Sequence, residues 1–379
     1  MKNYNLKALK IHQKLRGKVN INLKAKINNL DDLSIYYTPG VGAVSSYLHL
    51  NPEETSKYTW TNNLVAVISD GSAVLGLGNI GPKAALPVME GKAMLFKQLA
   101  GIDAVPIVLD VHQPKQIIDV IKAIAPSFGA INLEDIAAPI CFEVEEVLKK
   151  ELSIPIMHDD QHGTAVVTLA GLINATKLRK IPLNQSKVVL VGVGAAGTAI
   201  INLIHYYAPK ANIIAVDSTG IISRSRTDLN KYKQKLLKIT NLKNQNGSLK
   251  DALKEADIFI GVSKPKLLNK TLIRLMHKNP IIFAMANPEP EIYPDDAFRA
   301  GAFIVATGRS DFKNQVNNAL AFPGIFRGAL DNKINQITDD HKIAAATQIA
   351  NLVKKPSVDQ IIPNIFDKDL VKSIAKVII

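Results

Sequence analysis

The sequence has few of the features that mark a secreted or membrane protein. Its 379 residues include a single cysteine, Cys141, so no disulfide can form within the chain. The first residues lead into a lysine-rich segment without the apolar stretch of a signal peptide. The longest apolar run, residues 163–173, is too short to cross about 30 Å of hydrocarbon and is typical of a buried helix. We therefore expect a cytoplasmic protein that does not enter a membrane.

Acidic residues are scarce relative to basic ones. The formal net charge is +13, which in principle suits nucleic-acid binding. However, the basic residues are dispersed along the chain, and aromatic residues make up only 6% of it. A nucleotide-sensing regulator that binds DNA or RNA is therefore the weaker alternative, and we expect no nucleic-acid partner.

The first part of the chain predicts a mixed α/β domain. Residues 1–30 are expected to form a lysine-rich helical arm. Apolar runs then indicate strands, and segments with helical spacing lie between them. The expected strands cover residues 64–69, 104–109 and 154–157, and the expected helices cover residues 82–100 and 142–152.

After residue 160, strands and helices alternate regularly, which is typical of a doubly wound parallel sheet. The expected strands cover residues 188–191, 213–216, 258–261, 281–284 and 303–306. We therefore expect an N-terminal α/β domain over residues 1–160 and a Rossmann-type domain over residues 161–379. C-terminal helices complete the second domain, and the segment after about residue 320 is expected to pack partly on the first one.

Two acidic pairs fall at the ends of predicted segments. Glu134 and Asp135 lie upstream, and Asp159 and Asp160 open an apolar helix. Carboxylates in an apolar neighbourhood are costly unless a cation neutralises them. One aspartate could simply cap the helix, but two pairs favour a metal site. Ligands that are all oxygens favour Mg²⁺ or Mn²⁺ over Zn²⁺.

Other polar residues near these pairs have two interpretations each. His158 and His162 flank the aspartates, and we expect them to be packed rather than bound to metal. Lys92 lies in an apolar helix, where burial would lower its pKa and let it act as a base; it could equally reach out to solvent. Tyr37 is either a proton donor or a packed ring.

Two segments match the pattern G-x-G-x-x-G, with the glycines Gly76, Gly78 and Gly81 in one and Gly192, Gly194 and Gly197 in the other. The second follows a clean strand and opens a helix, which is the context of a dinucleotide-binding loop. The first is followed by Pro82 and is expected to be a structural turn or a loop that lines the substrate pocket.

The next strand after the second glycine loop ends at Asp217, where a carboxylate can bind the ribose 2′-OH of NAD. Arg224 and Arg226 follow closely and could meet the 2′-phosphate of NADP instead. NAD is favoured slightly, and NADP stays open.

Taken together, these motifs resemble the malic enzymes, particularly the small bacterial type. The matching segments occur in the order of the family between about residues 30 and 335: Tyr37-Thr-Pro-Gly-Val-Gly42, Asp70-Gly-Ser-Ala-Val-Leu-Gly-Leu-Gly-Asn-Ile-Gly81, Met89-Glu-Gly-Lys-Ala93, Asn132-Leu-Glu-Asp-Ile136, His158-Asp-Asp-Gln-His-Gly-Thr-Ala165, Ala286-Asn-Pro-Glu-Pro-Glu291 and Asn314-Gln-Val-Asn-Asn-Ala319.

The resemblance implies a role for each matching residue. Tyr37 would be the general acid and Lys92 the general base, supported by Asp159. The remaining implied sites are Glu134, Asp135 and Asp160 for the metal; Gly192, Val193, Gly194, Ala195, Ala196 and Gly197 for the cofactor; Asn287 for the nicotinamide or substrate; and Asn318, with Asn317 as the alternative, for a malate carboxylate, beside Lys92. Larger relatives carry an arginine where this chain has Ser72-Ala73.

The implied reaction is the oxidative decarboxylation of L-malate to pyruvate and CO₂, with reduction of NAD or NADP and a requirement for Mg²⁺ or Mn²⁺. Hydride transfer requires the nicotinamide, and the cation stabilises the charge that develops on loss of CO₂. A malolactic-type enzyme, which would retain its cofactor and release lactate, is the alternative. The family also implies a homodimer.

Overall fold

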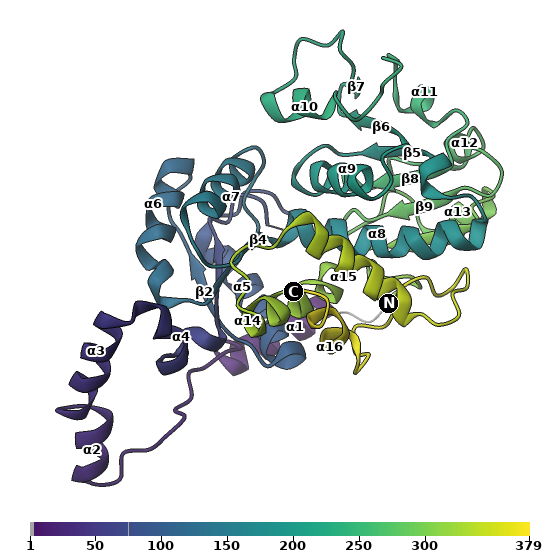
Figure 1. Cartoon of the computed structure of the whole chain (residues 1–379). Coiled ribbons are helices and arrows are strands. Elements are labelled where there is room, and N and C mark those ends of the chain that lie inside the picture. The colour runs from purple at the N-terminus through teal and green to yellow at the C-terminus, as the bar shows by residue number, and fades with distance from the viewer. Residues whose placement is uncertain (1–3, 75) are drawn as a thin grey trace.

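Two β-sheets, connected by one long helix, organise the chain (Figure 1). The computed structural model describes residues 4–74 and 76–379. The first sheet has four strands and the second has six. The predicted fold class, an α/β domain followed by a Rossmann-type doubly wound sheet, is confirmed.

The first sheet is entirely parallel, with the strand order β2-β1-β3-β4. Strands β1, β3 and β4 are buried, as expected for a parallel sheet, and the edge strand β2 is half-buried. Its strands are β1 (Leu64–Ser69), β2 (Asp103–Val108), β3 (Ala130–Leu133) and β4 (Ile156–His158), and the connecting helices are α5 (Pro82–Ala100), α6 (Pro114–Ile124) and α7 (Ile140–Glu151). Because all four strands run the same way, the residues that follow them gather at one edge of the sheet.

The second sheet has the order β10-β9-β8-β5-β6-β7, and only the short β7 is antiparallel. The order reverses between β5 and β8, which is where ligands bind in doubly wound folds. Its strands are β5 (Lys187–Val191), β6 (Asn212–Asp217), β7 (Gly220–Ile221), β8 (Ile258–Gly261), β9 (Ile281–Ala284) and β10 (Ile304–Thr307). Its helices are α9 (Ala195–Tyr207), α10 (Lys231–Leu236), α11 (Leu249–Leu253), α12 (Lys270–Ile273) and α13 (Pro294–Arg299).

Helix α8 (Asp159–Arg179) runs from the edge of the first sheet to the second sheet, so the expected boundary at residue 161 falls in its first turn. Most of its residues are buried, because helices α9 and α15 pack on it. The apolar run of residues 163–173 is thus the interior of a core helix. Among residues 4–74 and 76–379, no helix is both long and apolar enough to cross a membrane.

The C-terminal helices return to the first sheet. Phe96 of α5 contacts the rings of Phe322 and Phe326, at centroid distances of 4.7 and 5.3 Å. Both partner rings belong to α14, which therefore covers a helix of the first sheet. The helices of this segment are α14 (Phe322–Asp331), α15 (Asp339–Leu352) and α16 (Leu370–Ala375).

The N-terminal segment differs from the expected helical arm. Residues 1–3 lie outside the described part of the chain, and α1 (Tyr4–Leu15) ends where Arg16 and Gly17 adopt positive φ angles of 53° and 112°. Residues 17–29 are irregular, so the prediction of a helix to residue 30 was wrong. The arm is nevertheless held in place: the Lys18 Nζ donates to the carbonyl of Pro87 over 2.6 Å.

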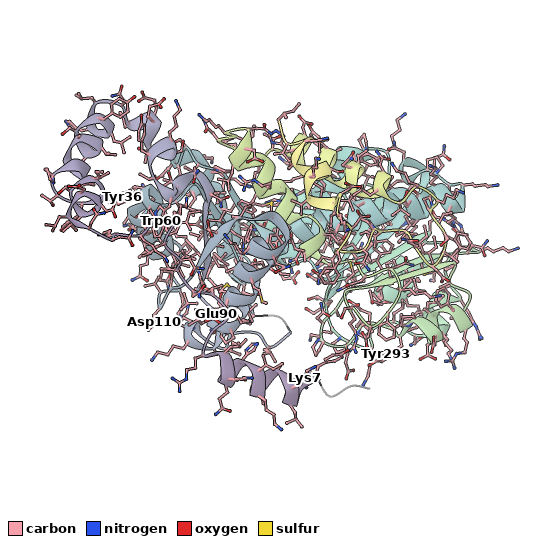
Figure 2. All side chains as sticks on the ribbon, turned by 90° about the horizontal axis from the view of Figure 1, so that it is seen from below. Lys7, Tyr36, Trp60, Glu90, Asp110 and Tyr293 are labelled. Atoms are coloured by element: carbon pink, nitrogen blue, oxygen red, sulfur yellow. The ribbon has the colours of Figure 1, made fainter. Side chains whose placement is uncertain are left out.

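A helical pair then projects from the rest of the chain. Helices α2 (Leu30–Tyr36) and α3 (Gly40–Leu50) lie far from both sheets in Figure 1, and the view from below in Figure 2 shows Tyr36 on the same projecting pair. No residue from 4 to 60 is buried, although many of these residues are apolar or aromatic. The remaining short helices are α4 (Thr55–Tyr58), η1 (Pro52–Glu54), η2 (Trp60–Asn63), η3 (Ala125–Ser127), η4 (Leu183–Gln185) and η5 (Asn318–Leu320).

Candidate active site

Two acidic pairs meet at the carboxyl edge of the first sheet. Glu134 and Asp135 directly follow β3, and Asp159 and Asp160 directly follow β4, its neighbour in the sheet. Carboxylate oxygens of Glu134, Asp135 and Asp160 all lie within 4.8 Å of one another. The structure therefore brings together the three predicted metal ligands. Burial raises the pKa of both Glu134 and Asp160, so their ionised forms need a neighbouring cation.

Asp135 connects the two acidic loops through its backbone. Its φ angle of 54° lies in the left-handed region, which residues other than glycine rarely adopt. Its N–H donates to Oδ2 of Asp160 over 2.7 Å. This bond holds the loop after β4 against the loop after β3 and supports the strained conformation.

Lys92 is the cationic partner that the chain itself supplies. Its ammonium lies 2.6 Å from Oδ2 of Asp159 and 2.9 Å from Oε1 of Glu134, and it sits 4.5 Å above the ring of Phe322. Only 7% of the residue is exposed. Lys92 is thus held in the carboxylate cluster from α5, and the alternative of a lysine that extends to solvent is wrong.

The pKa of Lys92 is shifted in the opposite direction to the sequence-based expectation. Burial alone would lower it, as we expected from the apolar helix. The carboxylates of Asp159 and Glu134 outweigh burial and raise the pKa of Lys92 above its ordinary value. The expectation of a lowered pKa was wrong, because the helix sequence gives no sign of two carboxylates that follow other strands.

Asp159 is fully buried beside Lys92, and burial raises its pKa to about 6, although Lys92 opposes the shift. Its carboxylate lies directly over Gly163: a Cβ on that glycine would come within 1.8 Å of Oδ1. The same Cβ would lie 3.1 Å from the Cβ of Asn318. Gly163 therefore permits both Asp159 and Asn318 to approach the first turn of α8.

Glu145 supports this turn from the other side and was not identified from the sequence. It is buried on α7, and its carboxylate accepts hydrogen bonds from the backbone N–H of His158 over 3.0 Å and from the ring of His162 over 2.8 Å. Lys149 also lies 2.7 Å from it. Both histidines are thus packed around the aspartate pair. A glutamate four residues before a lysine looks like an ordinary surface pair in sequence, so nothing signalled its role.

The second glycine loop has the geometry of a phosphate-binding turn. Gly192 has a φ of 101°, and a Cβ there would meet the carbonyl of Val262 at 2.6 Å. A Cβ on Gly197 would meet the carbonyl of Gly192 at 1.8 Å, so only glycine lets α9 approach β5. Gly194 is exposed, and a Cβ placed on it would have none of the described atoms within 4 Å, which leaves its backbone open to a ligand.

The residues between these glycines complete the loop. Val193 is buried at its base, and Ala195 and Ala196 form the first turn of α9. The N-terminus of a helix provides free backbone N–H groups that attract anions. The loop thus fits a pyrophosphate.

Asp217 ends β6 beside this loop and is held by two basic residues. Arg226 donates to both of its carboxylate oxygens over 2.8 and 3.1 Å, and Lys233 donates over 2.6 Å. Burial would raise its pKa, but these bonds lower it to about 2. The Arg224 side chain instead donates to the backbone carbonyls of Leu237 and Leu242. Of the two arginines considered, Arg226 is therefore the one that contacts Asp217, and the contact of Lys233 was not predicted.

The first glycine loop connects the two sheets. Its described residues fold on themselves, since a Cβ on Gly71 would meet the carbonyl of Gly81 at 2.3 Å. A Cβ on Gly76 would come within 2.1 Å of the backbone oxygen of Asn287, which follows β9 of the second sheet. Buried Glu291 accepts hydrogen bonds from the backbone N–H groups of Ser263 and Ala286 and so holds the Asn287 loop in place.

Two predicted residues are not part of the cluster within the chain. Tyr37 follows α2 on the projecting helical pair, and 65% of it is exposed. Asn317 uses its side chain to cap η5, accepting from the N–H of Ala319 over 2.9 Å. Asn318, by contrast, lies beside Gly163, as described above.

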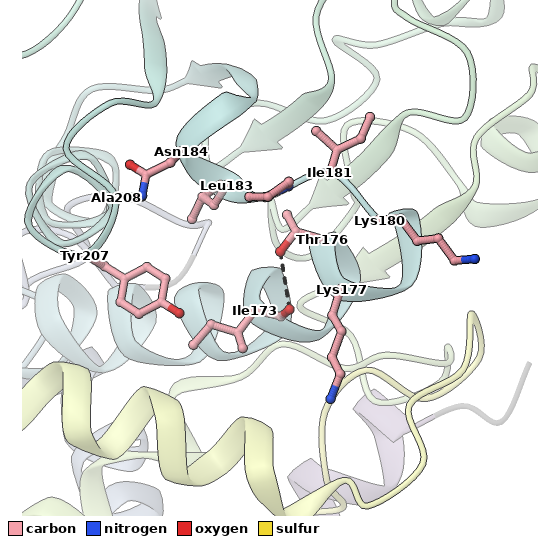
Figure 3. Close-up of a pocket in the computed structure, with 10 residues that line it drawn as sticks. Ile173, Thr176, Lys177, Lys180, Ile181, Leu183, Asn184, Tyr207 and Ala208 are labelled. Atoms are coloured by element: carbon pink, nitrogen blue, oxygen red, sulfur yellow. Dashed lines mark hydrogen bonds between the residues drawn. The ribbon is translucent and has the colours of Figure 1, made fainter.

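A separate cavity of about 590 Å³ lies at the far end of α8, where Thr176 bonds to the carbonyl of Ile173 (Figure 3). Lys177 and Lys180 on its wall come from the last turn and the end of that helix. None of the predicted site residues lines it.

Comparison with known protein families gives two matches. A family model described as "Malic enzyme, N-terminal domain" matches residues 16–149, and one described as "Malic enzyme, NAD binding domain" matches residues 161–378. A bifunctional malic/malolactic enzyme from Bacillus subtilis is 52% identical over 98% of this chain and 91% of its own length. An NADP-dependent malic enzyme from Halomonas elongata is 45% identical over 96% of this chain and 85% of its own length.

Solved structures match over the whole chain. The crystal structure of an NAD-dependent malic enzyme from Thermotoga maritima is 47% identical, has a TM-score of 0.95 and covers 98% of both chains. That of a malic enzyme from Pyrococcus horikoshii is 43% identical, with a TM-score of 0.93, and covers 99% of this chain and 89% of its own.

Proposed function

Because this chain belongs to the malic enzyme family, we propose that it converts L-malate to pyruvate and CO₂ with reduction of NAD or NADP. One observation carries the proposal. The ammonium of Lys92 is buried between Asp159 and Glu134, beside the group of three carboxylates. A proton-transfer group thus adjoins a cation site, in a chain that also contains a dinucleotide-type glycine loop.

The carboxylate group fits a divalent cation. Glu134, Asp135 and Asp160 offer oxygen ligands from two loops that a backbone hydrogen bond ties together. Hard oxygen ligands of this kind suit Mg²⁺ or Mn²⁺. Bound there, the cation would supply a Lewis acid for the C2 oxygen of malate, and the nicotinamide would supply the hydride acceptor.

Lys92 is the proposed base for the malate hydroxyl. The ammonium is stabilised by Asp159 and Glu134, so Lys92 must lose part of this support and release a proton before it can accept the proton of the malate hydroxyl. Glu134 would withdraw that support on becoming a metal ligand. Asp159 remains 2.6 Å away and can share the proton that Lys92 takes up.

Tyr37 is the proposed acid that protonates C3 after CO₂ leaves, and we propose that a second copy of the chain supplies it. Within one chain, Tyr37 is exposed on the projecting helical pair. The pair also exposes Leu30, Ile35 and Tyr47, a combination that is unfavourable in water and typical of an interface. A homodimer would bury these side chains and complete the site.

The Rossmann-type domain, residues 161–379, is proposed to bind the cofactor. Gly192 to Gly197 would hold the pyrophosphate, and Asn287 would contact the nicotinamide side. Asp217 suits the 2′-OH of NAD, but Arg226 and Lys233 compensate its charge and could meet a 2′-phosphate. We keep NAD as the preferred cofactor and NADP as an accepted one.

The substrate would lie between the two domains, residues 1–160 and 161–379. Asn318 lies next to Gly163 and Asp159, which suits an amide donor for a malate carboxylate. Ser72 cannot replace the arginine of larger relatives, because its hydroxyl donates to Asp70 over 2.6 Å and accepts from the N–H of Ala137. Lys92, Asn318 and the cation therefore carry the recognition of malate.

The test is an assay of reduced-nicotinamide absorbance with L-malate, run with NAD and with NADP, with Mn²⁺ and with EDTA. We expect metal-dependent reduction accompanied by pyruvate. Lactate without net reduction would favour the malolactic alternative, which the Bacillus subtilis relative also catalyses according to its name. Reduction that continues in EDTA, or reduction without pyruvate, would contradict the proposal.

A further inference from the structure

A second cavity, of about 670 Å³, lies between the two halves of the chain. Its walls come from α7 of the first domain, the start of α8, and α9, α10 and α15 of the second domain. None of the carboxylates of the proposed metal site lines it, nor does Lys92. We call it the α7/α15 cavity.

The wall carries both lysines and carboxylates, the latter from Glu145, Glu146 and Asp339, and two of its lysines keep donors to spare. Lys342 on α15 is only 4% exposed, and its ammonium bonds to Asp339 over 2.8 Å. Lys149 on α7 pairs with Glu145. An ammonium has three donors, so each lysine keeps some available.

Gln161 adds a buried amide to this wall. It is 4% exposed, and its Nε2 has no hydrogen-bond partner among the described residues. A buried donor without an acceptor is costly. Glu145, an acceptor on the same wall, is already used by the His158 N–H, the His162 ring and Lys149.

Lys149 also disfavours the charge of Lys342. Burial lowers the pKa of Lys342 and Lys149 lowers it further, although Asp339 and Glu145 oppose the shift. Both effects would be relieved by an anion between α7 and α15. A ligand with several acceptor oxygens would meet the spare donors of both lysines and the unpartnered amide of Gln161.

The cavity is in direct contact with the turn that carries the proposed metal ligands. Gln161 and His162 line it and immediately follow Asp159 and Asp160 in the chain. Glu145, also on the wall, holds the backbone that precedes Asp159. A ligand that shifts these side chains would move the first turn of α8.

We propose that the α7/α15 cavity is a regulatory site for a small oxyanion, with phosphate or carboxylate oxygens, held by Lys149, Lys342 and Gln161. Bound there, the anion bridges α7 and α15 and changes the affinity of the neighbouring carboxylates for the divalent cation. The effect on the cation rests on the proposed function, whereas anion binding itself does not.

The first experiment titrates inorganic phosphate into the full-length protein by calorimetry, without malate or metal. Saturating NADH keeps phosphate from the glycine loop. We expect saturable binding that Lys149→Gln weakens about tenfold or more, the loss expected for a charge-assisted hydrogen bond. The matched control is Lys150→Gln, which removes an adjacent exposed ammonium that does not line the cavity.

Lys342→Met provides a second variant on the opposite wall, with near-UV circular dichroism as the check that it folds. Absence of saturable binding to the wild type would overturn the proposal. Equal losses in Lys149→Gln and Lys150→Gln would also overturn it, as would wild-type affinity in a folded Lys342→Met.

A second titration measures Mg²⁺ affinity with and without phosphate. Linkage requires that the two ligands change each other's affinity by the same factor. The same titration with Lys149→Gln is the control, because any effect of phosphate that remains in this variant comes from direct binding of Mg²⁺ to phosphate in solution. An unchanged Mg²⁺ affinity would overturn the regulatory role, and carboxylate probes in place of phosphate show which oxyanion is preferred. Because no step uses malate turnover, failure of the proposed function would leave these results intact.

Discussion

Arg226 holds the carboxylate of Asp217 through two hydrogen bonds, of 2.8 and 3.1 Å. The acidic residue that would distinguish NAD in a Rossmann fold is therefore already engaged by a guanidinium. Lys233 adds a third bond to the same carboxylate. Cofactor preference in this chain should therefore depend on whether the side chains of Arg226 and Lys233 bind Asp217 or a 2′-phosphate of the cofactor.

Arg226→Gln is expected to shift the preference towards NAD. The variant releases Asp217 for a ribose 2′-OH and removes a bidentate partner for a 2′-phosphate. We expect kcat/KM with NADP to fall by about tenfold or more, the loss expected for one charge-assisted hydrogen bond, while kcat/KM with NAD changes little.

The matched control for this prediction is Arg224→Gln, because the Arg224 side chain donates to backbone carbonyls and not to Asp217. It should leave the ratio of the two cofactors unchanged. If both variants alter the ratio equally, long-range charge rather than the Asp217–Arg226 pair sets the preference.

Lys92→Ala is expected to abolish malate oxidation without releasing the cofactor. General acid–base catalysis contributes about 10²–10⁴-fold, so kcat should fall by at least about a hundredfold. NADH binding, followed by its fluorescence, should be nearly unchanged because the glycine loop belongs to the other sheet. Turnover near that of the wild type would remove Lys92 from the proposed mechanism.

The strand ends show why much of the site was predictable. Asp160 follows the apolar run 154–157 that predicted a strand, and parallel strands place such residues at one edge. Glu134 was identified only as part of an acidic pair. Gly192 and Gly197 were identifiable because their spacing fits one turn between a strand and a helix. The partners of Lys92 could not be deduced, since its contact with Asp159 spans 67 residues.

Other parts of the structure had no clear sequence signal. Strand β3 is only four residues long and was not predicted, although it carries Glu134 at its end. Glu145 has the helical spacing of a surface ion pair with Lys149, but three donors surround it in the core. The helix expected up to residue 30 ends at Arg16, where the left-handed backbone overrides the lysine-rich composition.

Glu145→Gln is expected to destabilise the protein and to loosen the turn at Asp159. Breaking a buried charged network costs about 3 kcal/mol of unfolding free energy at neutral pH. Burial opposes ionisation of Glu145, but His162 and Lys149 hold its pKa well below the usual 4.5. A carboxylate with a depressed pKa contributes stability that is present above about pH 4.5. This stability is lost as the pH falls through the lower pKa of the folded state.

Urea unfolding at several pH values checks this prediction. The difference between wild type and Glu145→Gln should be largest near neutral pH and should shrink as the pH falls below about 4.5. Glu146→Gln is the control, since Glu146 pairs with Lys150 at the surface and should change stability by less than about 1 kcal/mol. A difference that does not depend on pH would show that Glu145 acts through packing alone.

Tyr37→Phe and Lys92→Ala should each be inactive alone and active together. If a second copy supplies Tyr37, a hybrid dimer contains one site with both Lys92 and Tyr37 intact, whereas each parent dimer has none. We expect a mixture of the two variants, refolded or exchanged together, to regain malate oxidation. Gel filtration with distinguishable tags must confirm that hybrids form. Hybrids that remain inactive would show that Tyr37 and Lys92 act within one chain, so that the exposed helical pair folds back on its own first sheet. Activity of Tyr37→Phe on its own would show that Tyr37 has no catalytic role.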